Sequence, residues 1–174
     1  ELGHAFLQTW CRVGARDFVF NYAVPFFALV GERWALGEVS VMHEHFATHS
    51  MESFLAPQWR AVSNRAGGPR VLLANLPGEM HSLPLQFAAV LLSLANYRVT
   101  FLGADAPVGE IVRGTDSFDS DVVLIAISPS GPQERRQREM SELRDLLPAR
   151  IKLLIGGETA SEFDAASGIA LLPS

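Results

Sequence analysis

The feature of this sequence best suited to chemistry is a histidine with a carboxylate two residues before it. Glu79 and His81 lie in the segment Pro77–Pro84, where Gly78 and the prolines favour a turn. A neutral imidazole is a good ligand for a transition metal. A nearby carboxylate can accept the hydrogen of its second ring nitrogen, which fixes the tautomer and basicity of the ligand. Taken alone, the segment also fits a surface histidine in a loop between a strand and a helix.

Two further segments carry hydroxyl groups or glycines at points where predicted strands end. Ser128 and Ser130 follow one apolar run, and Gly156 and Gly157 close the next. Glycine has no side chain, so a planar group could approach the backbone closely there. The carboxyl ends of neighbouring parallel strands meet at one edge of a sheet, where α/β proteins bind their ligands. We therefore expect these residues to form one pocket with His81 at its mouth.

A second group of chemically versatile residues lies in the first third of the chain. Trp34 is followed by nine residues and then by Glu44 and His45. Each has an ordinary explanation, since Trp34 could be a core residue and the Glu-His pair a solvated helix face. His45 and His49 also share a helical face at a spacing that can hold zinc. The His-Glu-x-x-His pattern of zinc proteases is absent, so zinc is the lesser alternative.

The elements that must position these residues change in character after residue 66. Residues 1–66 carry apolar residues at helical spacing, which predicts a four-helix-type bundle of three or four helices, punctuated by Pro25 and Gly31. Residues 70–174 alternate apolar runs with helical segments, which predicts an α/β domain: a flavodoxin-like (Rossmann-like), doubly wound sheet of five parallel strands. The expected strands are 70–76, 97–102, 121–127, 151–155 and 169–172, and the expected helices are 85–95, 107–113, 133–147 and 159–164.

Composition narrows the functional classes. The 174 residues are 48% hydrophobic, so we expect a packed core. Only 19% are charged and the net charge is -5, so we do not expect this chain itself to bind nucleic acid. The single cysteine, Cys11, excludes an internal disulfide and fits a reducing, cytoplasmic setting. No apolar stretch reaches the ~20 residues of a membrane helix. The chain begins with Glu1 rather than Met and is interpreted as a fragment of something longer.

The α/β half resembles the cobalamin-binding domain shared by methionine synthase, corrinoid methyl carriers and certain mutases. That family carries Asp/Glu-x-His-x-x-Gly, then Ser-x-Leu, then Gly-Gly, at about the separations found here. The resemblance implies that the histidine ligates cobalt from below and that the cofactor's tail enters the sheet edge between the Ser and Gly motifs. The implied binding residues are Glu79, His81, Ser128, Ser130, Gly156 and Gly157, with His81 as the metal ligand.

Two positions depart from this pattern. Pro84 replaces the glycine of the first motif, and Ser130 replaces the leucine of the second. A proline in the first turn of a helix loses no hydrogen bond, so we expect Pro84 to open the following helix and the loop to keep its form.

The helical half resembles the light-sensing cobalamin domains of MerR-type transcription regulators, the CarH and LitR group. The shared signature is Trp34, a nine-residue gap and Glu44-His45, together with the Glu-x-His form of the loop. The resemblance implies that residues 1–66 cap the upper face of the corrin, with Glu44 and His45 at the upper ligand. In the best-studied photoreceptors a histidine follows the Trp and takes the upper cobalt site after light. Here that residue is Ala35, so His43, His45 or water would occupy the upper cobalt site after light.

These resemblances imply a cobalamin-binding light sensor of a transcription regulator, not an enzyme. Adenosylcobalamin is the expected cofactor, with methylcobalamin and hydroxocobalamin as alternatives. The expected output is a change in conformation and in self-association through the bundle, with DNA bound only by a segment absent from this chain and no membrane contact. Two alternatives stay open: a corrinoid carrier for methyl transfer, and a cobalamin-dependent anti-repressor that acts by protein contact.

Overall fold

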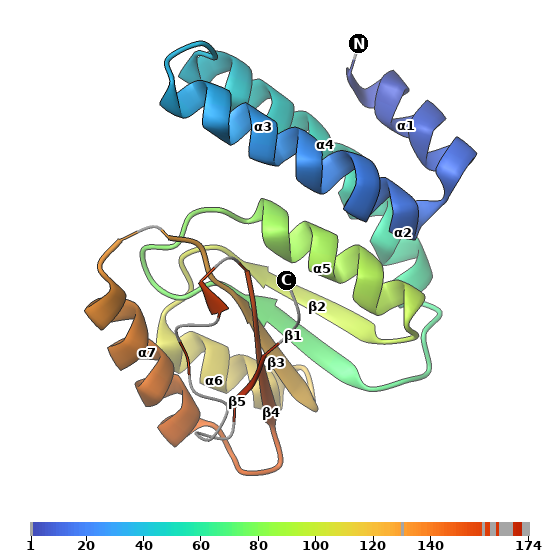
Figure 1. The fold of residues 1–174 in the computed structure, drawn as a ribbon. Helices are drawn as coiled ribbons and strands as arrows, with labels where there is room; N and C mark the ends of the chain where they lie inside the picture. The colour runs from blue at the N-terminus through green and yellow to red at the C-terminus, as the bar shows by residue number, and fades with distance from the viewer. Residues whose placement is uncertain (1, 130, 158, 161–162, 164–168, 172–174) are drawn as a thin grey trace. The chain divides into compact units, whose positions relative to one another are not determined.

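The computed structural model describes residues 2–129, 131–157, 159–160, 163 and 169–171. The chain divides into two compact units, Glu1–Ala61 and Val62–Ser174. Figure 1 shows the helices of the first unit and the sheet of the second. No helix in the described part of the chain is both long and apolar enough to cross a membrane.

The first unit is built from helices, with a turn at residues 36–40 before the last of them. Its elements are α1 (Leu2–Val13), α2 (Ala15–Phe18), the π-helical turn η1 (Val19–Ala23), α3 (Val24–Ala35) and most of α4 (Val41–Ser63). Gly14, with φ 84°, adopts a conformation that other residues resist and separates α1 from α2.

Helices α2, η1 and α3 follow one another without a break, so neither Pro25 nor Gly31 ends a helix as the sequence suggested. Pro25 lies in the first turn of α3, directly after the π-helical turn. Proline has no N–H to continue the ladder of helical hydrogen bonds, and local irregularities of this kind accommodate it.

Aromatic rings form the core of the helical unit. Phe18 of α2 is 1% exposed, and its ring centroid lies 5.4 Å from that of Trp10 and 5.7 Å from that of Phe54. Phe6 completes the cluster at 6.0 Å from Phe54 and 6.3 Å from Phe18. Edge-to-face contacts of this kind stabilise beyond the area they bury, and here they join α1, α2 and α4.

The second unit is built on a five-stranded sheet with the order β2-β1-β3-β4-β5. The strands are β1 (Arg70–Ala74), β2 (Arg98–Gly103), β3 (Val122–Ala126), β4 (Lys152–Gly156) and β5 (Ile169–Leu171). All neighbouring strands pair in parallel. The predicted fold class, with its flavodoxin-like strand order, is confirmed, and the switch point lies between β1 and β3.

Helices cover both faces of the sheet, with α5 (Leu83–Leu94) on one side and α6 (Val108–Ser117) and α7 (Gln133–Leu146) on the other (Figure 1). Alternate residues of a strand face opposite sides. Leu72 of β1 accordingly joins a buried cluster with Ile111 of α6 and Leu143 of α7. β1 and β3 are buried on both faces and therefore consist of continuous apolar runs. Of the expected helix 159–164, only part lies within the described residues.

Candidate functional site

His81 lies in the loop between β1 and α5, at the carboxyl edge of the sheet. The loop turns at Gly78, which has φ 81° and is the position where a Cβ atom would lie 3.1 Å from the Arg135 guanidinium. Helix α5 begins at Leu83, and Pro84 lies in its first turn as predicted. The side chain of His81 is 63% exposed, so an external group can reach its imidazole.

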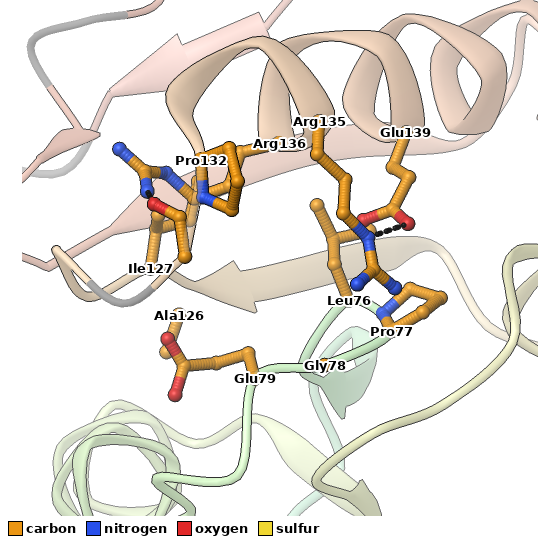
Figure 2. Close-up of a pocket in the computed structure, with 11 residues that line it drawn as sticks. Leu76, Pro77, Gly78, Glu79, Ala126, Ile127, Pro132, Arg135, Arg136 and Glu139 are labelled. Atoms are coloured by element: carbon orange, nitrogen blue, oxygen red, sulfur yellow. Dashed lines mark hydrogen bonds and ion pairs between the residues drawn. The ribbon is translucent and has the colours of Figure 1, made fainter.

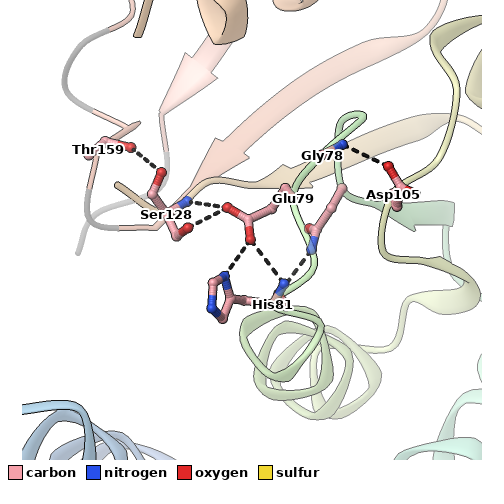
Figure 3. A network of polar contacts seen from close by, with 7 residues as sticks. Gly78, Glu79, His81, Asp105, Ser128 and Thr159 are labelled. Carbon is pink, nitrogen blue, oxygen red and sulfur yellow. Dashed lines mark hydrogen bonds and ion pairs between the residues drawn. The ribbon is translucent and has the colours of Figure 1, made fainter. Parts of the chain in front are cut away.

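Glu79 joins the histidine to the neighbouring strand β3 (Figure 3). Its Oε1 accepts hydrogen bonds from the His81 backbone N–H at 2.9 Å and from the His81 Nδ1–H at 2.6 Å. Its Oε2 accepts from the Ser128 backbone N–H at 3.3 Å and from the Ser128 hydroxyl. An ionised carboxylate can only accept, so Nδ1 carries a proton, and in the neutral ring the lone pair lies on Nε2. This arrangement presents Nε2 as a metal ligand.

These contacts stabilise the ionised form of Glu79. The residue is only 8% exposed, and burial by itself would raise the pKa of its carboxyl group. Hydrogen bonds from Ser128 and His81 more than offset burial, so the pKa lies below its ordinary value. Glu79 therefore stays ionised at neutral pH and can keep the His81 ring in one tautomer.

Gly157 is required by the packing of the chain itself. It has φ 115°, and a Cβ atom on it would lie 2.1 Å from the carbonyl oxygen of Ile127. Gly156 accepts a hydrogen bond from the Ile127 N–H at 2.9 Å. The two glycines thus fix the end of β3 and, with it, the position of Ser128. They can do this whether or not a ligand also approaches the backbone there. Ser130, the other predicted hydroxyl, lies outside the described residues.

A small pocket adjoins this network on the side of α7 (Figure 2). Arg135 points from the first turn of α7 toward Pro77 and Gly78, and its Nε donates to Glu139 at 2.9 Å. The lining residues come from the ends of β1 and β3 and from α7: Leu76, Pro77, Gly78, Glu79, Ala126, Ile127, Gly131, Pro132, Arg135, Arg136 and Glu139.

Sequence reasoning missed residues that hold the histidine loop. Asn75 donates from Nδ2 to the carbonyl oxygen of His81 at 2.9 Å, and Asp105 accepts the Gly78 N–H at 2.7 Å. Thr159 donates to the Ser128 carbonyl oxygen at 3.4 Å. All three follow the carboxyl ends of strands, which is the signal that could have identified them.

In the helical unit the predicted residues lie at the ends of two helices. Trp34 is 50% exposed near the end of α3, where Ala35 is the last residue. Glu44, in the first turn of α4, is hydrogen bonded to His45 Nδ1 and accepts from the Thr48 hydroxyl at 2.8 Å. The Glu44 carboxylate is therefore hydrogen bonded to both a histidine and a hydroxyl group, as the Glu79 carboxylate is.

The zinc alternative gains no support from the structure. Within the described ranges, no three His, Cys, Asp or Glu side chains are grouped so that they could hold a metal ion. A fully protein-made zinc site needs about four such ligands, and His45 with His49 supplies only two.

Two bacterial transcriptional repressors are similar to this chain. The chain is 29% identical over 144 residues to the HTH-type transcriptional repressor CarH of Myxococcus xanthus, covering 81% of this chain and 47% of the relative. It is 30% identical over 125 residues to the repressor CarA of the same organism, covering 71% and 43%. The chain thus spans less than half of either repressor.

The fold is also found among solved structures. The monomethylamine corrinoid protein of Methanosarcina barkeri matches 94% of this chain and 80% of its own with a TM-score of 0.66, at 16% identity. The B12 binding domain profiles match residues 69–170, with the sheet and the His81 loop, and residues 4–56, in the helical unit. On this match the chain belongs to the B12 binding domain family.

Proposed function

We propose that this chain binds cobalamin with His81 as the lower ligand of cobalt, as the sensing part of a light-responsive transcription regulator. The observation that carries the cobalamin assignment is the double contact of Glu79 with His81 and Ser128. The donor set fits, because the loop offers one exposed imidazole whose Nδ1 is held by a buried, ionised carboxylate. Cobalt is well suited to a neutral imidazole ligand.

Each residue of the lower site has a separate task in this proposal. His81 would bind cobalt through the Nε2 lone pair. Glu79 keeps the proton on Nδ1, and Ser128, after the neighbouring strand, fixes Glu79. Gly157 keeps the end of β3 close to β4, so that Ser128 stays within reach of Glu79. When a metal-bound histidine is oriented in this way, its partners affect affinity nearly as strongly as the ligand itself.

For the upper face of the cofactor, we propose Trp34, Glu44 and His45 as the contacts. Trp34 exposes half of a flat apolar side chain that can cover the corrin. Glu44 and His45 place a hydrogen-bonded polar pair near the start of α4, suited to sugar hydroxyl groups. This polarity favours adenosylcobalamin, which when bound supplies a cobalt–carbon bond that light can break. Ala35 cannot ligate metal, so His43, His45 or water would serve after illumination.

The regulatory part of the proposal rests on the similarity to the two repressors. Loss of a bulky upper group can shift a two-state arrangement only through contacts that differ between the states, and Trp34 and Glu44 would supply them. The expected result is a change in conformation and self-association, passed to a DNA-binding segment outside this chain. In this proposal the chain itself catalyses no reaction.

One experiment tests the proposal in stages. The purified chain is mixed with adenosylcobalamin in the dark, and its visible spectrum and size-exclusion profile are recorded before and after illumination. His81→Ala should abolish corrinoid binding, whereas His4→Ala, an exposed histidine of α1, should bind as the wild type does. Unchanged binding by His81→Ala would overturn the ligand assignment.

The light response separates the regulator from its main competitor. A corrinoid carrier for methyl transfer has support in the fold shared with the monomethylamine corrinoid protein. A carrier must expose its upper face to a partner enzyme and has no need of Trp34. Binding that is unaffected by Trp34→Ala, with no change in size on illumination, would favour the carrier over the sensor.

A further inference from the structure

We propose that Asn75 and Asp105, which lie outside the Glu79–His81–Ser128 network, are positioning residues that hold the His81 loop in its cobalamin-binding conformation. The inference rests on the function proposed above. It adds a second layer of support, in which Asn75 reaches the loop from the end of β1 and Asp105 from the segment after β2. Ser128 reaches Glu79 from the end of β3 (Figure 3).

Asn75 fixes the end of the loop that carries the histidine. It follows directly after β1 and is fully buried. Its backbone N–H donates to the Gly103 carbonyl oxygen at 2.9 Å, and its carbonyl oxygen accepts from the Ala106 N–H at 3.1 Å. From this fixed point its Nδ2 donates to the His81 carbonyl oxygen at 2.9 Å. The backbone from which the imidazole projects is thereby anchored to the sheet.

The other atom of the Asn75 amide makes the residue partly unfavourable for stability. Its Oδ1 has no hydrogen-bond partner among the residues that the structure describes. A buried polar atom without a partner is unfavourable, and an apolar side chain of the same shape avoids that cost. The Asn75 amide thus carries a cost at Oδ1, whereas its Nδ2 is needed for the contact with His81.

Asp105 fixes the other end of the loop through a reciprocal pair of hydrogen bonds. Its Oδ1 accepts from the Gly78 N–H at 2.7 Å, and its own N–H donates to the Glu79 carbonyl oxygen at 3.0 Å. Asp105 has φ 52°, a left-handed conformation that aspartate and asparagine tolerate better than most residues. The pair sets the backbone of Glu79, whose carboxylate must reach both Ser128 and His81.

The two contacts together leave little freedom to the loop. It is tied at Gly78 and Glu79 by Asp105 and at His81 by Asn75, so the metal ligand and its carboxylate partner are both set before any ligand arrives. Binding sites lose affinity when supporting residues allow shifts of about 0.5 Å. Removing either contact should therefore weaken cobalamin binding without removing a ligand atom.

The test uses the full chain with the variants Asn75→Leu, Asp105→Ala and Asp105→Asn. Asp121→Ala is the matched control, because the Asp121 carboxylate accepts the Arg70 N–H at 2.8 Å at the start of β1, the end of the strand away from the His81 loop. Hydrogen exchange of the Gly78 amide and thermal unfolding are measured without ligand. The affinity for hydroxocobalamin and the visible spectrum of the complex are measured next.

We expect Asn75→Leu and Asp105→Ala to bind hydroxocobalamin about 10- to 100-fold more weakly. Asn75→Leu loses one hydrogen bond but also the unpaired Oδ1, so it should lower the unfolding temperature no more than Asp121→Ala does. In the chain without ligand, Asp105→Ala should speed exchange of the Gly78 amide. Asp105→Asn keeps an acceptor for that amide and should restore most of the affinity. Asp121→Ala should lower stability without changing the affinity or the spectrum.

Two results would overturn the inference and are distinguishable. If the wild type binds cobalamin through His81 but Asn75→Leu and Asp105→Ala bind as tightly as Asp121→Ala, the positioning role fails and the proposed function stands. If the wild type binds no cobalamin, or His81→Ala binds equally well, the proposed function fails and the positioning role falls with it.

Discussion

Gly157 lies so close to Ile127 that a Cβ atom on it would be 2.1 Å from the Ile127 carbonyl oxygen. Gly157→Ala should therefore destabilise the sheet unit, because a backbone oxygen cannot move aside as a flexible side chain can. The φ of 115° adds strain that only glycine avoids. We expect the free energy of unfolding, measured with urea, to fall by roughly 1–3 kcal/mol.

The matched control is Gly109→Ala in α6, where a new Cβ atom would meet nothing within 4 Å. Alanine is the better helix former, so this variant should keep or raise the free energy of unfolding by about 0.5 kcal/mol. Equal effects of the two substitutions would contradict the packing argument.

Ser128→Ala should weaken the buried end of the Glu79 network. The variant removes a hydroxyl donor from a carboxylate that is 8% exposed, and the free energy of unfolding at pH 7 should fall by about 1–3 kcal/mol. The pKa of Glu79 should rise, because the Ser128 hydrogen bond is the largest of the contributions that lower it. Carbon-13 NMR of the Glu79 carboxyl group measures this directly.

The pH dependence has a definite sign. A carboxyl pKa that is lower in the folded chain contributes stability above the unfolded pKa, and this stability is lost as pH falls through the folded value. The difference between wild type and Ser128→Ala should therefore shrink in acid. Ser141→Ala on the exposed face of α7 should stay within about 0.5 kcal/mol of the wild type at every pH.

Glu79→Gln tests how much the orientation of His81 contributes to cobalamin affinity, because the variant keeps the histidine but loses its carboxylate partner. The amide keeps one acceptor oxygen and replaces the other with a donor, so it cannot serve His81 and Ser128 as the carboxylate does. On the proposed function, the affinity for hydroxocobalamin measured by visible titration should fall about 10- to 100-fold. Glu142→Gln on exposed α7 should leave it unchanged; parallel losses in both variants would refute a local role.

Phe18→Ala should strongly destabilise the helical unit. Phe18 is 1% exposed and its ring contacts those of Phe6, Trp10 and Phe54. The substitution should lower the free energy of unfolding by about 3–5 kcal/mol, as followed by circular dichroism. Phe20→Ala, two residues along at 49% exposure, should cost far less. A comparable loss at Phe20 would show that the ring cluster is not the core of this unit.

The sheet was predictable because its central strands are continuous buried runs. The predicted strands 70–76 and 121–127 contain β1 and β3, and they extend beyond the observed strands by Asn75 and Leu76 and by Asp121 and Ile127. The uninterrupted passage from α2 to α3 was not predictable. Proline usually limits a helix, and the π-helical turn that accommodates Pro25 has no sequence pattern of its own.

Within the site, the contact between Glu79 and His81 followed from their spacing, because a carboxylate two residues away can reach the ring. Asn75 and Asp105 could have been recognised as candidates from their positions after strand ends, but their contacts depend on how two separate loops meet, which no local pattern encodes. Gly157 was assigned to ligand approach alone. The structure adds a second reason, close packing on Ile127, which depends on the pairing of β3 with β4.

The bond between Glu79 and Ser128 joins residues that lie 49 positions apart in the chain. During synthesis, the histidine, its carboxylate and α5 emerge well before the serine that completes the network. A truncated chain that stops before β3 would carry His81 and Glu79 but not the serine that fixes the carboxylate. On the proposed function, cofactor binding would therefore wait until β3 has joined the sheet, so the topology disfavours loading of a half-made protein.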